Sequence, residues 1–86
     1  RADDRRYELV LGETVISFAT YRLRDGVVVI PHVETTPELR GRGFADTLLS
    51  GIVDDVRARE LTVRALCPYA ASFLHDNPST HDVLAD

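Results

Sequence analysis

The chain has 86 residues, the length of one small domain, so we treat residues 1–86 as a single unit. Its 44% hydrophobic and 28% charged content is typical of a soluble globular protein, and no apolar run approaches the roughly 18 residues of a membrane-spanning helix. The net charge of −4 argues against non-specific binding to nucleic acids, and the single cysteine excludes an intramolecular disulfide.

The first third of the chain predicts three strands. Residues 1–6 are polar and are expected to fray. Runs that include many β-branched and aromatic residues predict an antiparallel meander. Its three strands are expected at residues 7–11, 14–23 and 27–34.

The third predicted strand has two features that bear on its place in a sheet. Residues 27–30 are apolar on both faces, so we expect a central strand that is covered by helices. Pro31 has no N–H to give to a ladder, so we expect the pairing to be broken or bulged there. Gly12 and the pair Asp25-Gly26 supply the turns that precede the second and third strands.

The second half of the chain changes to a helical period. Apolar residues recur at three- and four-residue steps through residues 44–60, which predicts an amphipathic helix. Gly51 inside this helix is expected to mark close packing against the sheet. Residues 61–67 alternate in polarity and predict a strand parallel to the third one, joined to it by a right-handed crossover. Pro68 then opens a short helix at residues 69–75.

Between the third strand and the first helix, residues 35–45 form a loop that contains two glycines and two arginines. Gly41 and Gly43 permit positive φ and a close approach of the backbone to a ligand. The N–H groups that open the helix favour a phosphate, and Arg40 and Arg42 can add charge-assisted contacts. The loop matches neither a Walker A loop nor the dinucleotide pattern G-x-G-x-x-G. The alternative interpretation is a strand-to-helix turn without a ligand.

The loop resembles the acyl-CoA loop of the GNAT superfamily of acetyltransferases, whose pattern Q/R-x-x-G-x-G/A reads here as Arg40-x-x-Gly43-x-Ala45. The order of elements, βββαβα, matches the GNAT core, an α/β (α+β) fold with a mixed sheet, without the helices that usually lie between its first two strands. A closer resemblance is to a short, one-domain GNAT-like group. The segments shared with that group are Ile30-Pro31-His32-Val33-Glu34, Pro37-x-Leu39-Arg40-Gly41-Arg42-Gly43, Leu66-Cys67-Pro68-Tyr69 and Asn77-Pro78.

The resemblance implies that the chain binds acetyl-CoA. In the superfamily the loop amides hold the CoA pyrophosphate, and a backbone N–H on the preceding strand, which falls near Val33, polarises the thioester carbonyl. Pro31 is expected to splay this strand from its neighbour. The residues expected to contact CoA are Val33, Glu34, Thr35, Arg40, Gly41, Arg42, Gly43, Phe44 and Ala45. The chain departs from the short group at Ser79-Thr80, where an aromatic residue is usual, and at Glu60, where glycine is common.

His32 and Glu34 are two residues apart, so they share one face of a regular strand. His32 is the candidate general base, acting directly or through water, and Glu34 can orient it. The alternative is an exposed polar pair at the end of a strand, since Glu in particular is ordinarily a solvated surface residue.

Cys67 is expected at the C-terminal end of a strand, the side on which open α/β sheets bind ligands. Its thiol can act as a nucleophile or donate a proton to the leaving thiolate, or it can be an inert, buried side chain. Tyr69 is the other candidate acid and matches the superfamily's tyrosine only loosely; its alternative is a core or rim aromatic. His75 and His81 are expected at the surface, with no spacing that builds a metal site.

Two functions are compatible with these features. The first is an acetyl-CoA-dependent N-acetyltransferase acting on a primary amine that the sequence does not identify. The second is an acyl-CoA-binding or interaction module with the same fold and little catalysis, which the short chain favours. The lone cysteine and the lack of a membrane or signal segment are compatible with a cytoplasmic protein, which we expect to be a monomer or a weak dimer. Because the chain begins at Arg1 rather than Met, we expect a few leading residues to be missing.

Overall fold

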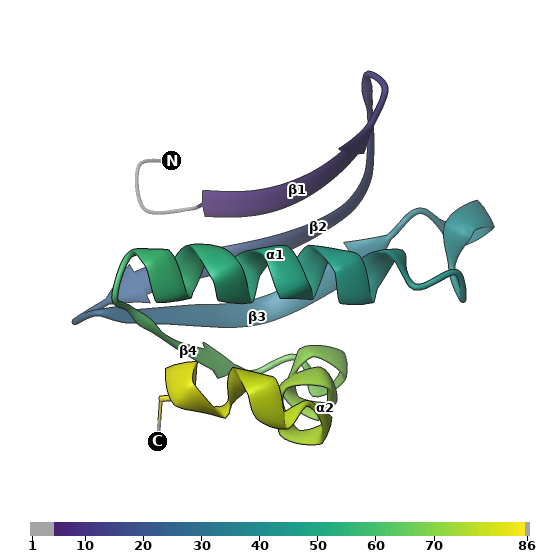
Figure 1. Cartoon of the computed structure of the whole chain (residues 1–86). Coiled ribbons are helices and arrows are strands. Elements are labelled where there is room, and N and C mark those ends of the chain that lie inside the picture. The colour runs from purple at the N-terminus through teal and green to yellow at the C-terminus, as the bar shows by residue number, and fades with distance from the viewer. Residues whose placement is uncertain (1–4, 86) are drawn as a thin grey trace.

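The computed structural model describes residues 5–85, which form one four-stranded sheet with two α-helices and two short 3-10 helices (Figure 1). The strands are β1 (Arg5–Leu11), β2 (Thr14–Arg24), β3 (Val27–Thr35) and β4 (Thr62–Ala65). The helices are α1 (Phe44–Ala58), α2 (Pro68–Asp76), η1 (Pro37–Leu39) and η2 (Pro78–Val83). The sheet order is β1-β2-β3-β4, antiparallel except that β4 runs parallel to β3. The expected mixed sheet and βββαβα order are confirmed.

Helix α1 lies across the sheet and forms the centre of the core (Figure 1). Its inward side chains are no more than 5% exposed, and these are Leu48, Leu49, Ile52, Val53 and Val56. Val28 and Ile30 of β3 face them, and Ala70 and Leu74 of α2 join the same cluster. Burial of these aliphatic side chains is the main force that holds the two layers together.

β3 is the central strand, as expected, but helices cover only one of its faces. Val28 and Ile30 are fully buried in the core, whereas Val27 and Val29, on the opposite face, are only half-buried. Both α-helices contribute to the single core cluster on the first face. The expectation of a strand covered on both sides is therefore wrong. A strand paired along both edges is shielded by its neighbours, so its valines stay partly buried without a second layer of helix.

The meander begins earlier than predicted. Arg5 and Arg6 pair with β2, so the expectation that these two residues fray is wrong; the rest of that expectation, residues 1–4, lies outside the described residues. The Arg6 guanidinium lies 4.0 Å from the centre of the Phe18 ring on β2. Cross-strand pairing and this cation–π contact give the first two residues of β1 their order.

Helix α1 has the predicted period, but Gly51 does not lie against the sheet. Gly51 is exposed, and a Cβ built on it would have nothing within 4 Å. Each residue of a helix turns by about 100°, which carries Gly51 away from the inward-facing Ile52. The expectation that Gly51 marks close packing is therefore wrong.

Helix α1 ends at Ala58, two residues before the predicted end. Glu60 adopts the left-handed conformation with φ 57°, which stops the helix. The Glu60 N–H donates to the carbonyl of Arg57 at 3.1 Å, and the Leu61 N–H donates to the carbonyl of Val56 at 2.9 Å. These two bonds form a Schellman motif, which satisfies the last carbonyls of the helix.

β4 is shorter than the strand predicted at residues 61–67. Leu61 belongs to the helix cap, and the ladder with β3 ends at the pair Ile30–Ala65. The N–H groups of Leu66 and Cys67 both approach the carbonyl of Ile30, at 2.8 and 3.3 Å. The chain then turns into α2, because a proline at the first helical position cannot extend the ladder.

The polar C-terminal segment forms η2, which lies beside α2 and β4 (Figure 1) and also contacts α1. Arg57 of α1 donates to both carboxylate oxygens of Asp82, at 2.9 and 2.8 Å, and to the carbonyl of Ser79 at 2.9 Å. Thr80 is buried, and its hydroxyl lies 2.9 Å from the carbonyl of Leu74, in the last turn of α2. At this departure from the short group, Thr80 therefore caps the last turn of α2 and the Ser79 carbonyl contacts α1.

Candidate functional site

β3 has one open edge next to the glycine loop. Its ladder with β4 runs from Val27 to Ile30, whereas its ladder with β2 continues as far as Thr35. Around Pro31 the register with β2 also shifts, as expected for a residue without an N–H. The second half of β3 therefore diverges from β4, and one side of its backbone faces the gap between them. The expected splay at Pro31 is present.

The N–H groups of β3 divide between its two edges. The Thr36 N–H, just past the strand, donates to the carbonyl of Ile16 at 2.9 Å and so points toward β2. Because N–H groups alternate along an antiparallel strand, those of Val33 and Thr35 point toward the open edge. The Thr35 carbonyl agrees with this direction, since it accepts a bond from Arg40 Nε at 3.3 Å on the open side.

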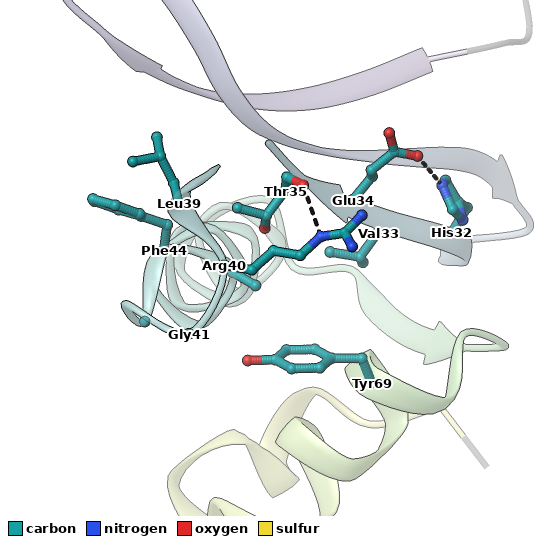
Figure 2. A pocket seen from close by; sticks show the side chains of 11 residues that line it. His32, Val33, Glu34, Thr35, Leu39, Arg40, Gly41, Phe44 and Tyr69 are labelled. Carbon is teal, nitrogen blue, oxygen red and sulfur yellow. Dashed lines mark hydrogen bonds and ion pairs between the residues drawn. The ribbon is translucent and has the colours of Figure 1, made fainter. Parts of the chain in front are cut away.

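A cavity of about 400 Å³ borders this open edge (Figure 2). Its lining comes from β3, the glycine loop, the first turn of α1 and the first turn of α2. The lining residues are His32, Val33, Glu34, Thr35, Leu39, Arg40, Gly41, Gly43, Phe44, Ala45 and Tyr69. In Figure 2, Gly41 and Phe44 lie at one end and His32 at the other, with Tyr69 facing β3 across the space.

At Gly41 and Gly43 the loop presents backbone rather than side chains to the cavity. Gly41 and Gly43 have φ of 80° and 83°, and a Cβ on either would have nothing within 4 Å. Gly43 is the N-cap of α1 and offers no side-chain cap, so the first N–H groups of the helix are left to other partners. The N-terminus of a 15-residue helix attracts anions, and the glycine backbone lets an anion approach it closely.

The two arginines of the loop are placed differently. Arg40 lines the cavity and reaches back over Thr35 (Figure 2). Arg42 is exposed and does not line the cavity. Arg40 can therefore contact an anion within the cavity, whereas Arg42 can contact one only at its rim.

His32 and Glu34 contact each other on the solvent-facing side of β3. Their Nε2 and Oε1 atoms are 2.9 Å apart, and the two side chains are 55% and 49% exposed. The expectation that they share a face is confirmed. The Phe18 ring lies beside His32, with centroids 6.1 Å apart. A carboxylate on one ring nitrogen fixes the tautomer in which the other nitrogen can accept a proton.

Tyr69 forms one wall of the cavity, but its hydroxyl is already engaged. It donates a hydrogen bond of 2.5 Å to Asp46 in the first turn of α1. That hydrogen bond, partial burial and the carboxylate charge raise the pKa of Tyr69 above its usual value. The phenol therefore keeps its proton at neutral pH and shares it with Asp46.

Cys67 lies outside the cavity lining. It is the N-cap residue of α2 and is half-buried, packed against the edge of the core. His75 and His81 are exposed on α2 and η2, as expected. Within residues 5–85, no three His, Cys, Asp or Glu side chains are placed to hold a metal ion, and no helix is long and apolar enough to cross a bilayer.

Two residues near the cavity were not singled out by sequence reasoning as site residues. Leu39 lines it from the 3-10 turn η1, which the sequence did not predict. Asp46 holds Tyr69 across 23 residues of sequence. Pro37 at the first position of η1 was the available signal for Leu39, whereas a contact over such a separation left no local signal.

The chain matches a family model over most of its length. The model is described as GCN5-related N-acetyl-transferase, and it matches residues 6–83. The chain therefore belongs to the GCN5-related N-acetyltransferase family, also called GNAT. No curated protein gives a significant match.

Solved structures of acetyltransferases share the fold. A GCN5-like putative N-acetyltransferase from Staphylococcus aureus is 28% identical, with a TM-score of 0.76 over 93% of this chain and 80% of that one. The ribosomal-protein-S18-alanine N-acetyltransferase from Escherichia coli is 15% identical, with a TM-score of 0.71 over 88% of this chain and 52% of that one. An IAA acetyltransferase from Bacillus cereus, also 15% identical, has a TM-score of 0.68 over 87% and 54% of the two chains.

Proposed function

We propose that the protein is an N-acetyltransferase that uses acetyl-CoA to acetylate a primary amine. The observation that carries this proposal is the open edge of β3 beside a cavity that begins at the N-terminus of α1. Membership of the GNAT family supports the reaction class. The cavity, about 400 Å³, is within the range of small-molecule sites.

The loop end of the cavity suits the pyrophosphate of CoA. Gly41 and Gly43 keep the backbone bare, and the first N–H groups of α1, from Phe44 onward, offer donors to an anion. Arg40 adds a guanidinium from the cavity wall, and Arg42 adds one from the rim. This arrangement recognises phosphate oxygens by backbone geometry, which does not depend on the protonation of any side chain.

The open edge of β3 suits the pantetheine and thioester portions. Acetyl-CoA supplies an activated acetyl group whose carbonyl must be polarised for attack. The N–H of Val33 points toward the open edge and is our proposed donor to that carbonyl, and the Thr35 N–H points the same way. Glu34 and Ala45 border the same space and complete the proposed CoA contacts.

His32 is the proposed general base. It lies at the end of the cavity opposite the loop, where an amine would approach (Figure 2). Glu34 holds one ring nitrogen at 2.9 Å, which leaves the other free to take the amine's proton directly or through water. Glu34 is a positioning residue in this proposal as well as a wall of the cavity.

The proton for the departing thiolate has two candidate sources. The Tyr69 phenol lies in the cavity wall and keeps its proton at neutral pH, but it must first leave Asp46. The thiol of Cys67 stands just beyond β4 and outside the cavity lining. Of these two residues only Tyr69 lines the cavity, so we favour it as the acid and keep Cys67 as the alternative.

A second function, acyl-CoA binding with little catalysis, is favoured by the same pair of residues. The Tyr69 phenol donates its hydrogen bond to Asp46 rather than into the cavity, and Cys67 does not line the cavity. A site that holds CoA without delivering a proton to its sulfur would turn over slowly. The two functions differ in turnover and not in CoA affinity.

One experiment separates the two functions. Calorimetry measures binding of CoA and acetyl-CoA, and a thiol-release assay scans a panel of primary amines. We expect the protein to bind acetyl-CoA and to release the CoA thiol in the presence of an amine. In His32→Gln, kcat should fall about 10²–10⁴-fold, because general-base catalysis contributes that factor. His75→Gln is the matched control, since His75 is exposed on α2 outside the cavity. Binding without release would favour the second function, and no binding would overturn both.

The acid is assigned by a second pair of variants. Tyr69→Phe removes the phenol and Cys67→Ala removes the thiol, and we expect both to retain CoA binding. Loss of turnover in Tyr69→Phe alone supports the favoured assignment. Loss in Cys67→Ala alone would transfer the role to the thiol, and protection of Cys67 from a thiol probe by acetyl-CoA would then be expected.

A further inference from the structure

A second hollow, of about 320 Å³, lies on β1 and β2 and is ringed by arginines. It is lined by Arg5, Arg6, Thr20, Tyr21, Arg22 and Pro31. Three of the ten basic residues of an acidic chain gather here, although like charges repel one another. Such a concentration of guanidinium groups has an energetic cost that a bound anion would offset.

Among the described residues, few side chains compensate the charges of the arginines in this hollow. Within residues 5–85, Arg5 and Arg22 have neither a hydrogen bond nor an ion pair through their side chains. Arg6 lies 3.6 Å from Glu8 and packs on the ring of Phe18 at 4.0 Å. Two guanidinium groups are thus free to bind a ligand, and the third is held in place by an aromatic ring.

The hollow lies next to the end of the first cavity that holds His32. Thr20, in the hollow, is the cross-strand partner of His32, and Pro31 is its neighbour along β3. Phe18 links the two regions. The Arg6 guanidinium packs over its ring, and the centroid of that ring lies 6.1 Å from the centroid of the His32 ring. The sheet therefore brings the arginines of β1 and β2 within two strands of the proposed base.

The span between the two can be estimated from strand spacing. His32 lies on β3, Thr20 opposite it on β2, and Arg6 opposite Thr20 on β1. Two strand spacings amount to roughly 10 Å. A ligand that presents an amine to His32 would therefore reach the arginines with a group about three extended residues away.

We propose that this hollow is an anion subsite for the acceptor, so that the preferred substrate is a primary amine bearing a carboxylate or phosphate roughly 10 Å away. The inference rests on the proposed function, because it takes His32 as the place where the amine reacts. Guanidinium forks bind both oxyanions through paired N–H groups, so the shared chemistry is a tethered oxyanion. The chain's net charge of −4 disfavours the binding of an anionic substrate over much of the surface, whereas the arginines of the hollow attract it.

The test compares amidated tetrapeptides that differ only at the fourth residue. Three alanines precede aspartate, phosphoserine or asparagine, which places the anion about 10 Å from the N-terminal amine. We expect kcat/KM for the aspartate or phosphoserine peptide to exceed that of the asparagine peptide about fivefold, as exposed charge pairs allow. The double variant Arg5→Gln with Arg22→Gln should abolish this ratio through KM. Arg24→Gln, an exposed arginine of β2 outside the hollow, should preserve it.

A binding measurement makes the inference independent of turnover. The N-acetylated forms of the same peptides are product analogues, and their binding is followed by the NMR shifts of the Thr20 and Arg22 amides. If the acidic peptides shift these NMR signals and the neutral peptide does not, but no acetyl group is transferred, the subsite is supported and the proposed function is overturned. Equal rates for acidic and neutral peptides, or a preference that survives in the double variant, would overturn the subsite. NMR shifts that are the same for acidic and neutral peptides would also overturn the subsite. The better of the aspartate and phosphoserine peptides identifies the oxyanion.

Discussion

The two ends of helix α1 are built in opposite ways. At its C-terminal end, Glu60 and Leu61 close the last turn with two backbone bonds, and Arg57 joins it to η2. At its N-terminal end, Gly43 provides no side-chain cap, and a Cβ added at Gly41 or Gly43 would have nothing within 4 Å. A helix end whose backbone groups are satisfied serves stability, and one whose groups are exposed to a cavity serves binding.

The C-terminal end of α1, which we call the closed end, also includes a partly buried polar cluster. The Tyr7 hydroxyl of β1 donates to Asp55 at 2.7 Å, and Arg59 reaches the same carboxylate oxygen at 3.2 Å. Tyr7 stacks on Tyr21 with ring centroids 4.5 Å apart. These contacts fasten the edge strand β1 to the helix. The N-terminal end, which we call the open end, has a comparable link from Asp46 to Tyr69, whose side chain lines the cavity.

The comparison is tested most strongly at the open end. Gly43→Val places a β-branched side chain in a backbone conformation with φ 83° beside the proposed pyrophosphate site. We expect CoA affinity to fall about 100-fold, equivalent to the loss of one or two charge-assisted backbone contacts. Calorimetry measures the affinity, and circular dichroism checks that the fold is retained.

Gly12→Val is the matched control, because Gly12 also has positive φ and open space around it but lies in the β1–β2 turn. It should lose stability and keep CoA affinity. Unchanged CoA affinity in Gly43→Val would contradict the assignment of the loop.

The second prediction concerns the closed end. Tyr7→Phe removes the hydrogen bond to Asp55 and should lower the free energy of unfolding by about 1 kcal/mol. Burial, followed by the hydrogen bond to Asp55, raises the pKa of Tyr7, and the bond from Tyr7 with the contact of Arg59 lowers the pKa of Asp55. Denaturant titrations at several pH values measure both effects.

The sign of the pH dependence differs for the two groups. The Tyr7 contribution is complete below the unfolded pKa of roughly 10 and is lost as the pH rises beyond it. The Asp55 contribution is complete above roughly pH 4 and is lost as the pH falls through its lowered folded pKa. Tyr7→Phe should flatten the alkaline slope; an unaltered alkaline slope in that variant would show that Tyr7 does not produce it.

A third change should improve the closed end. Glu60 holds φ 57°, a conformation that costs an L-residue roughly 1–2 kcal/mol and glycine almost nothing. Glu60→Gly should therefore stabilise the protein by about 1 kcal/mol, after the added entropy of the unfolded chain is allowed for. Thermal unfolding measures the gain. Glu13→Gly, in a turn residue without positive φ, should give none, and equal gains in both variants would rule out the conformational explanation.

The smallest expected effect lies between the two ends. Gly51 is exposed in the helix interior with nothing near its missing Cβ. Gly51→Ala should stabilise α1 by up to about 1 kcal/mol through helix propensity alone, without altering CoA affinity. Gly26→Ala is the contrasting control, because its φ of 80° makes alanine unfavourable. A loss of stability in Gly51→Ala would indicate a packing role that the structure does not show.

Sequence patterns predicted most of the fold because the decisive signals are local. The β-branched runs, the period of α1 and the turn at Asp25-Gly26 fixed the elements and their order. Errors arose where a neighbour decided the outcome. The strand at residues 61–67 was predicted too long because its end is set by the divergence of β3. Gly51 is a different case, because the helical period itself turns it away from the inward-facing Ile52.

The candidate site was predicted unevenly. The glycine loop and the His32–Glu34 pair came from spacing, and the structure places Gly41, Gly43 and the pair along one cavity. Cys67 was expected at the ligand end of a strand, but it caps α2 outside the lining. Whether Cys67 faces a ligand depends on where β4 stops, which a hydrogen bond to Ile30 on another strand determines.

By itself, the sequence determined the order of strands and helices, the bare backbone of the glycine loop and the shared face of His32 and Glu34. Each of these follows from alternation, helical period or the conformational freedom of glycine, which act over a few neighbouring residues. Only the tertiary structure decided that Asp46 holds Tyr69 and that three arginines of β1 and β2 line one hollow within about two strand spacings of His32. Those arrangements depend on strand register and helix packing, which bring together residues too distant along the chain for any local pattern to record.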